Sequence, residues 1–105
     1  MCHVLGARYG IPHGFANAVM LPHAMEFNRT AARAMGRGAS APAAIAAVRD
    51  LATAVGAPRR LSDLGVPRDA LGAMAEDAFL DRDVYYNPRR IGSPAEIQAI
   101  YEAAW

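Results

Sequence analysis

Apolar residues recur at helical spacing in segments bounded by proline or glycine, and this pattern restricts what the chain can fold into. In the last segment they fall at positions i, i+3, i+4, i+7 and i+8: Ile97, Ile100, Tyr101, Ala104 and Trp105. Such positions form one face of a helix. No alternating apolar run is flanked by hairpin-turn residues, so strands are not expected. The sequence therefore predicts an all-α fold of about five helices.

Capping residues indicate where the later helices begin. Ser93 can accept a hydrogen bond from the amide of Glu96, and the Glu96 side chain can reach back to the amide of Ser93 as a capping box. Pro94 suits the first helical position, where its missing N–H costs nothing. Ser40 is expected to open an earlier helix in the same way, and another helix starts near Pro67.

The residues predicted to be buried on these two earlier helices follow from the same spacing. Gly56 is expected just past the end of the first, where Pro58 blocks continuation. Asp69 in the first turn of the second suits the helix dipole. The predicted stripe of the first is Ile45, Val48, Leu51, Ala52 and Val55. That of the second is Leu71, Met74, Ala75, Ala78 and Phe79.

The first 28 residues predict two more helical pieces. Residues 1–9 form one of them, and Gly10-Ile11-Pro12 interrupts it. The other runs from Phe15 to Phe27 and is almost wholly apolar. Pro22 inside this run should kink the helix or end its first part. Residues 29–39, with two glycines, are expected to form a small connection.

Composition excludes several classes of function. The chain has 105 residues and is 53% hydrophobic, which suits one folded domain. It has 11 basic and 10 acidic residues, so no strong field would attract nucleic acid or an acidic membrane. Its single cysteine, Cys2, cannot form an internal disulfide. No apolar run approaches the roughly 20 residues of a membrane span, and a cytoplasmic protein is expected.

Three histidines, His3, His13 and His23, lie in the most apolar part of the chain. Their ten-residue spacing is not that of a zinc site on one helix, and a histidine in such a setting is usually a hydrogen-bonded core residue. His13 differs because Pro12 and Gly14 flank it, which predicts a position at a helix start where an imidazole can ligate a divalent metal. Gly14 would allow the backbone a close approach. His23 is expected to be structural, bonded to a carbonyl that Pro22 frees.

The order of these residues resembles the signature of the iron-containing (group III) alcohol dehydrogenases. That signature has a His, a Leu-Gly pair, a Pro-His-Gly, and a Leu-Pro-His that leads into an aromatic-Asn pair. Here these motifs lie between Cys2 and Asn28. Two later segments resemble the family more loosely, Leu61-Ser62-Asp63-Leu64-Gly65-Val66 and Asn87-Pro88-Arg89 before the last helix. Residues 29–40 are shorter than the family usually has.

The resemblance implies a fold and a set of roles. Residues 1–105 would form the C-terminal helical, metal-site domain of a dehydroquinate-synthase-like enzyme, and the N-terminal nucleotide-binding domain is not among them. The family holds a divalent metal, Fe or Zn, with one Asp and three His, and His13 matches the last of these ligands. The other ligands would lie before Met1. His3 matches a histidine that is not a ligand but lies beside the nicotinamide of NAD or NADP and helps move a proton.

The resemblance also implies a small alcohol or carbonyl substrate. Residues 11–27 are apolar on most faces, so a surface patch that favours self-association, and hence a homo-oligomer, is expected. With one ligand present, the chain alone is expected to bind no metal tightly and to be inactive. Cys2-His3-Val4-Leu5-Gly6 is closer to the maleylacetate reductases of the family, whereas Gly14 follows the metal-dependent alcohol dehydrogenases. A non-catalytic helical module that acts through oligomerisation or binding is a further alternative.

Overall fold

Helices make up the regular structure of this chain in a computed structural model that describes residues 1–34 and 40–105. No strand occurs in these ranges, which confirms the predicted all-α class. The α-helices are α1 (Cys2–Tyr9), α2 (His13–Ala34), α3 (Ala41–Ala54), α4 (Leu71–Phe79) and α5 (Pro94–Ala104). The 3₁₀ turns η1 (Ser62–Leu64) and η2 (Arg68–Ala70) join α3 to α4, and η3 (Arg82–Tyr86) joins α4 to α5.

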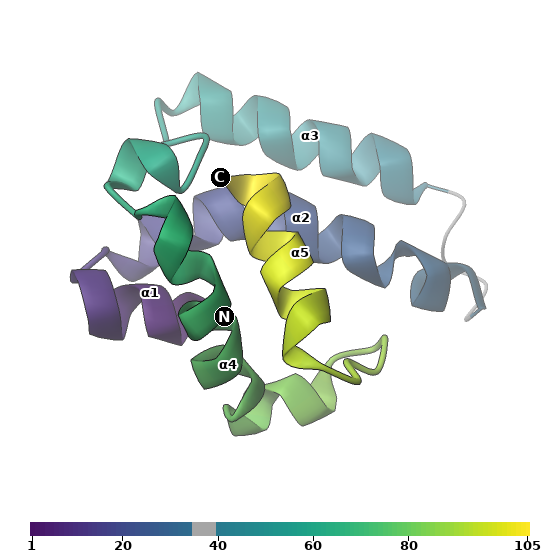
Figure 1. The fold of residues 1–105 in the computed structure, drawn as a ribbon. Coiled ribbons are helices and arrows are strands. Elements are labelled where there is room, and N and C mark those ends of the chain that lie inside the picture. Colours follow the sequence, from purple (N-terminus) through teal and green to yellow (C-terminus); the bar gives the residue numbers. More distant parts are fainter. Residues whose placement is uncertain (35–39) are drawn as a thin grey trace.

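The apolar face of α5 lies at the centre of the fold. α5 packs against α4 and α2, and α1 packs on α2 and α4 around the same core (Figure 1). Ile97 and Tyr101 of α5 are fully buried, and burying each such side chain contributes roughly 1.5–3 kcal/mol. The Tyr101 hydroxyl also donates to the Met1 carbonyl at 2.9 Å, which ties α5 to the start of α1. The predicted face of this helix is confirmed.

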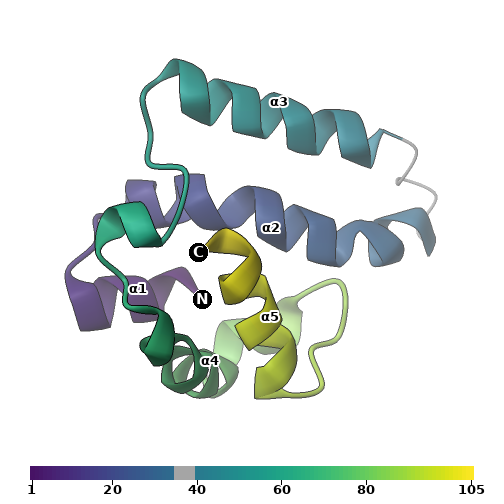
Figure 2. The same ribbon diagram turned by 45° about the horizontal axis from the view of Figure 1, so that its top comes forward.

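Helix α3 lies outside this core. It packs along α2, on the side away from α4 and α5 (Figure 2). Ile45 is buried, but Leu51 is 65% and Val55 is 71% exposed. The predicted stripe is therefore wrong at Leu51 and Val55, whereas Val48 and Ala52 are half-buried. The stripe predicted for α4 is confirmed at its four buried positions, Leu71, Met74, Ala75 and Ala78.

The end of α3 follows the prediction. Gly56 has a φ of 69°, a left-handed conformation that glycine adopts without strain. Its amide donates to the Thr53 carbonyl at 3.1 Å, and the amide of Ala57 donates to the Ala52 carbonyl at 2.9 Å. This pair of bonds satisfies carbonyls of the last turn.

Helix α2 is longer than the sequence predicts. It begins at His13 and continues through the buried Pro22 to Ala34, so the proline does not end it. The prediction of a connection is wrong for residues 29–34, and its remainder, 35–39, lies outside the described residues. Packing of α2 against α1, α3 and α5 explains the continuation, since tertiary contacts stabilise a helix beyond its local propensity.

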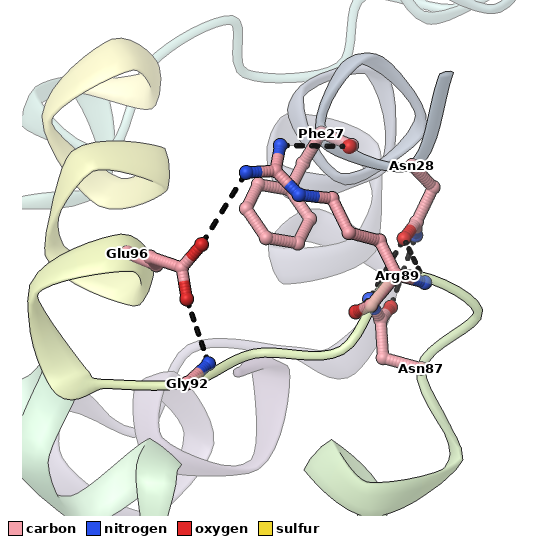
Figure 3. A network of polar contacts seen from close by, with 6 residues as sticks. All are labelled: Phe27, Asn28, Asn87, Arg89, Gly92 and Glu96. Atoms are coloured by element: carbon pink, nitrogen blue, oxygen red, sulfur yellow. Dashed lines mark hydrogen bonds and ion pairs between the residues drawn. The ribbon is translucent and has the colours of Figure 1, made fainter. Parts of the chain in front are cut away.

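The capping box predicted at the start of α5 is wrong in its partners. The side chain of Ser93 makes no capping bond. Instead the carboxylate of Glu96 accepts from the amide of Gly92 at 2.7 Å and from the guanidinium of Arg89 at 3.3 Å (Figure 3). Ser40 likewise begins α3 without a side-chain bond. The helices start where predicted, but Glu96 is held by the segment before the helix.

Arg89 belongs to a polar network that joins this segment to α2 (Figure 3). Its guanidinium lies 4.0 Å from the centre of the Phe27 ring and donates to the Phe27 carbonyl. Asn28 and Asn87 exchange side-chain amide bonds of 3.0 and 2.7 Å. The Asn28 oxygen also accepts the amide of Arg89 at 3.2 Å. Both sequence motifs, Phe27-Asn28 and Asn87-Pro88-Arg89, therefore meet in one clamp that holds α2 to the start of α5.

We predict that Asn28→Ala lowers the free energy of unfolding by about 1–3 kcal/mol, because it leaves half-buried partners without their bonds. Asn17→Ala is the matched control, since Asn17 is exposed on the same helix. Chemical denaturation of both variants measures the difference. Equal stabilities would show that the network does not hold the fold.

Apolar side chains remain at the surface of the described residues. Within residues 11–27, Phe15 and Leu21 are about half exposed, whereas Val19 and Met20 are buried in the chain itself. Leu51 and Val55 of α3 are more exposed than either Phe15 or Leu21. None of the helices in the described ranges combines the length and apolarity of a membrane span.

Self-association is predicted from this exposed surface. We expect the purified chain to scatter light as an oligomer and Leu51→Glu to reduce its mass, because Leu51 is exposed on α3. Asp50→Glu, beside it in the sequence, is a control that adds no charge. A monomer at all concentrations would contradict the prediction.

Candidate functional site

His13 occupies the first position of α2, as the sequence predicts. Gly10 ends α1 with a φ of 63°, and its amide donates to the Gly6 carbonyl at 3.0 Å. The Pro12 carbonyl then accepts the amide of Ala16 at 3.1 Å, which starts the new helix. The Gly10-Ile11-Pro12 turn therefore reverses the chain between two helices and places His13 at an exposed helix end.

The turn brings His3 and His13 together. Their ring centres are 6.2 Å apart, and the rings are stacked with an angle of 25° between their planes. Both residues are exposed, with 62% of the His3 side chain accessible. The ten-residue spacing excludes a single helix that presents both histidines. In the structure, His3 lies in the first turn of α1 and His13 in the first turn of α2.

Two aspartates complete the surroundings of His3, and sequence reasoning missed both. His3 Nδ1 lies 2.9 Å from Asp81 Oδ2 and 3.6 Å from Asp83 Oδ2. These residues flank the start of η3, and 78 positions separate His3 from Asp81. Only the packing of α1 on α4 brings them together. An ion pair of 2.6 Å between Arg8 and Asp77 links the same two helices.

The carboxylate of Asp81 is held as an anion. It accepts the amide of Asp83 at 3.2 Å through Oδ1 and the His3 ring through Oδ2. The Asp83 amide, followed by the His3 ring, lowers the pKa of Asp81 below its ordinary value of 3.8. Asp81 is therefore ionised at neutral pH.

One predicted role for Gly14 has no support within the chain. A Cβ placed on Gly14 would meet no atom within 4 Å among the described residues. The predicted close approach of backbone is therefore not made by any part of the chain that the structure describes. The exposed surface beside His13 is open at this point.

His23 lies away from the His3–His13 pair. It is half-buried and lines a cleft of about 710 Å³ between α2, α3 and the end of α5. Burial, and then the cation of Arg49, lowers the pKa of His23 below its ordinary value of 6.5. No bond to a freed carbonyl contributes to this shift, so the predicted hydrogen bond is not found in the described residues.

Other sequence motifs take structural positions in the fold. Leu61 and Val66 are buried, and the carboxylate of Asp63 accepts the amides of Arg59 and Arg60. The indole of Trp105 donates to the Val66 carbonyl at 2.8 Å. The segment from Leu61 to Val66 therefore anchors the end of α5 and has no place in the histidine cluster.

Comparison with known proteins places residues 1–105 on the family model of the Fe-containing alcohol dehydrogenase family, C-terminal. The chain is 39% identical over 120 residues to 1,3-propanediol dehydrogenase from Klebsiella pneumoniae, covering 100% of the chain and 31% of the relative. It is 37% identical over 109 residues to maleylacetate reductase from Burkholderia cepacia, covering 100% of the chain and 30% of the relative.

The fold of the chain is also similar to that of solved relatives. A crystal structure of 1,3-propanediol oxidoreductase superposes with a TM-score of 0.88 at 39% sequence identity, covering 99% of this chain and 31% of that one. The chain therefore spans about a third of the length of the relatives that it matches.

The lowered pKa of His23 leads to a prediction. Arg49→Gln should raise this pKa toward 6.5, because it removes the cation that opposes protonation. Arg33→Gln is the control, since Arg33 is exposed in the last turn of α2. NMR titration of the imidazole measures both, and an unmoved His23 in the Arg49 variant would contradict the assignment.

The same shift has a consequence for stability. A histidine whose folded pKa lies below 6.5 contributes stability that is complete above that pH and is lost as the pH falls through the lowered pKa. Stability should therefore decline on mild acidification, and less so in the Arg49→Gln variant. Urea denaturation between pH 7 and pH 5 measures the difference.

Proposed function

This chain belongs to the Fe-containing alcohol dehydrogenase family, and we propose that it supplies the C-terminal, metal-site part of an oxidoreductase. The proposed reaction interconverts a small alcohol and a carbonyl compound by hydride transfer with NAD or NADP. The enzyme names of the relatives support this class of reaction. Because the chain spans about a third of those relatives, the activity is proposed for a protein that contains this chain and a nucleotide-binding part.

The observation that carries the proposal is the stacking of His3 on His13. These are the two histidines that the family resemblance assigns to the reaction, and they lie on separate helices with their ring centres 6.2 Å apart. His23, which the resemblance does not assign to it, lies elsewhere in a cleft with Arg49. The geometry thus separates the two proposed functional histidines from the third.

His13 is suited to be one ligand of a divalent metal. Its ring projects from an exposed helix start, where donors from outside the described residues can meet it. Within the described residues, the metal-capable cluster consists of His3, Asp81 and Asp83 and does not include His13. His13 therefore fits as a contributor to a shared site, and we propose that the chain alone holds no metal through it.

The chemistry assigns distinct roles to the two rings. A bound divalent cation lowers the pKa of an alcohol and polarises a carbonyl group. His13 would hold that cation through one imidazole nitrogen. His3, beside it, would accept the hydroxyl proton and pass it to solvent, which its 62% exposed side chain reaches directly. A nicotinamide cofactor would supply the acceptor of the hydride, and no residue of this chain is proposed to bind it.

A maleylacetate reductase is the alternative within the same family. The alignment with the Burkholderia relative spans 109 positions, against 120 for the propanediol dehydrogenase. Within the aligned region, this chain of 105 residues therefore differs less in length from the maleylacetate reductase than from the propanediol dehydrogenase. The substrate would then be an unsaturated keto-dicarboxylate in place of a simple alcohol, with His3 moving the proton in the opposite direction.

The test uses a protein that carries this chain together with a nucleotide-binding part of the family. We expect His13→Gln to reduce bound metal by more than about tenfold and His3→Gln to lower kcat by about 10²- to 10⁴-fold with metal retained. His23→Gln is the matched control and should leave both unchanged. Metal analysis and NAD(P)H absorbance, with 1,3-propanediol and maleylacetate as substrates, give the readouts.

Two outcomes would overturn the proposal. Full metal content in the His13 variant would remove it from the ligand set. NAD(P)-dependent turnover by the purified chain of 105 residues alone would show that no further part is needed. The preferred substrate distinguishes the alcohol dehydrogenase from the maleylacetate reductase.

A further inference from the structure

We infer that Asp81 is a positioning residue that fixes the tautomer and orientation of the His3 ring. This inference rests on the proposed role of His3 in proton transfer. It starts from the 2.9 Å contact between His3 Nδ1 and Asp81 Oδ2. A carboxylate can only accept, so the proton of a neutral His3 ring lies on Nδ1, and Nε2 keeps the lone pair that takes a proton.

The position of Asp81 is itself fixed by the fold. Its amide donates to the Ala78 carbonyl at 3.2 Å, and its carbonyl accepts the amide of Val84 at 3.1 Å. Its side chain caps η3 through the amide of Asp83. Only 21% of the Asp81 side chain is exposed, against 70% for Asp83. The fold therefore holds the Asp81 carboxylate in place beside His3, whereas the Asp83 side chain is largely in solvent.

The His3 ring is in contact with two groups, the His13 ring and the Asp81 carboxylate. The His13 ring is stacked on it, which restricts rotation while Asp81 holds Nδ1. An anion at Nδ1 also stabilises the imidazolium that forms when Nε2 accepts a proton. One proton moves to Nε2 in this step and later leaves for solvent, and Asp81 keeps its charge throughout.

A cation held directly by His3, Asp81 and Asp83 is the competing interpretation. Their donor atoms lie within 4.8 Å of one another. However, both oxygens of Asp81 already accept hydrogen bonds, from the Asp83 amide and from His3. The two interpretations differ in their need for Asp83, since a metal site requires its carboxylate and the positioning of His3 does not.

The experiment measures the His3 tautomer by ¹⁵N NMR in the full chain of 105 residues, at a pH where the ring is neutral. We expect the Nδ1–H form in the wild type. In Asp81→Asn the ratio of Nδ1–H to Nε2–H forms should fall by roughly tenfold, because a charge-assisted bond is lost. Asp83→Asn, the matched control, should keep the wild-type ratio. Asp81→Ser, which retains a capping oxygen, serves if the Asn variant does not fold.

Two results would overturn the inference. The first is an unchanged tautomer in both Asp81 variants. The second is tight Zn²⁺ binding by the wild-type chain that either Asp81→Asn or Asp83→Asn abolishes, which would establish the metal site in its place.

A second measurement separates this inference from the proposed function. In the protein with the nucleotide-binding part, Asp81→Asn should lower kcat about 10- to 100-fold at nearly constant KM and alter the pH profile. If the tautomer changes as expected but His3→Gln retains full activity, the proposed function of His3 fails and the positioning by Asp81 stands. If His3→Gln is inactive and Asp81→Asn changes neither the tautomer nor the pH profile, the reverse holds.

Discussion

The burial of one face of α5 against α2 and α4 is the interaction on which the other parts of the structure depend. Ile97 and Tyr101 lose all contact with solvent in this interface, and α1 is held to it through the Tyr101 hydroxyl. Because α1 and α2 both pack on this centre, the turn between them has a fixed geometry. The stacked histidines are therefore a product of core packing as well as of their local sequence.

Local sequence was sufficient for much of the fold. Helical spacing predicted the buried faces of α4 and α5, and the Gly56 conformation followed from the residues at the end of α3. Predictions failed where a distant neighbour decides the outcome. Leu51 is exposed although its spacing matches that of the half-buried Val48 and Ala52, and Glu96 pairs with Arg89 and Gly92 in place of Ser93. The spacing of residues along one helix does not show which of them a distant segment covers or binds.

The candidate site, like the fold, was predicted from the sequence only in part. The position of His13 at a helix start followed from Pro12 and Gly14, and the family resemblance singled out His3. Asp81 was missed because it lies 78 positions from His3, and its immediate sequence shows only a polar residue at the end of a helix. The Asn28 and Asn87 motifs join α2 to the segment before α5. Their exchange of amide bonds explains a sequence pattern that resembles a functional signature.

The peripheral place of α3 has a consequence for how this domain can vary in evolution. No residue of α3 belongs to the main apolar core, and its end lies far along the chain from His3 and His13. Longer connections at a surface cost little conformational entropy, and surface segments accept insertions more readily than core elements do. Insertions and deletions beside α3 should therefore leave the stacked histidines undisturbed, so that relatives of unequal length can share this arrangement of the two rings.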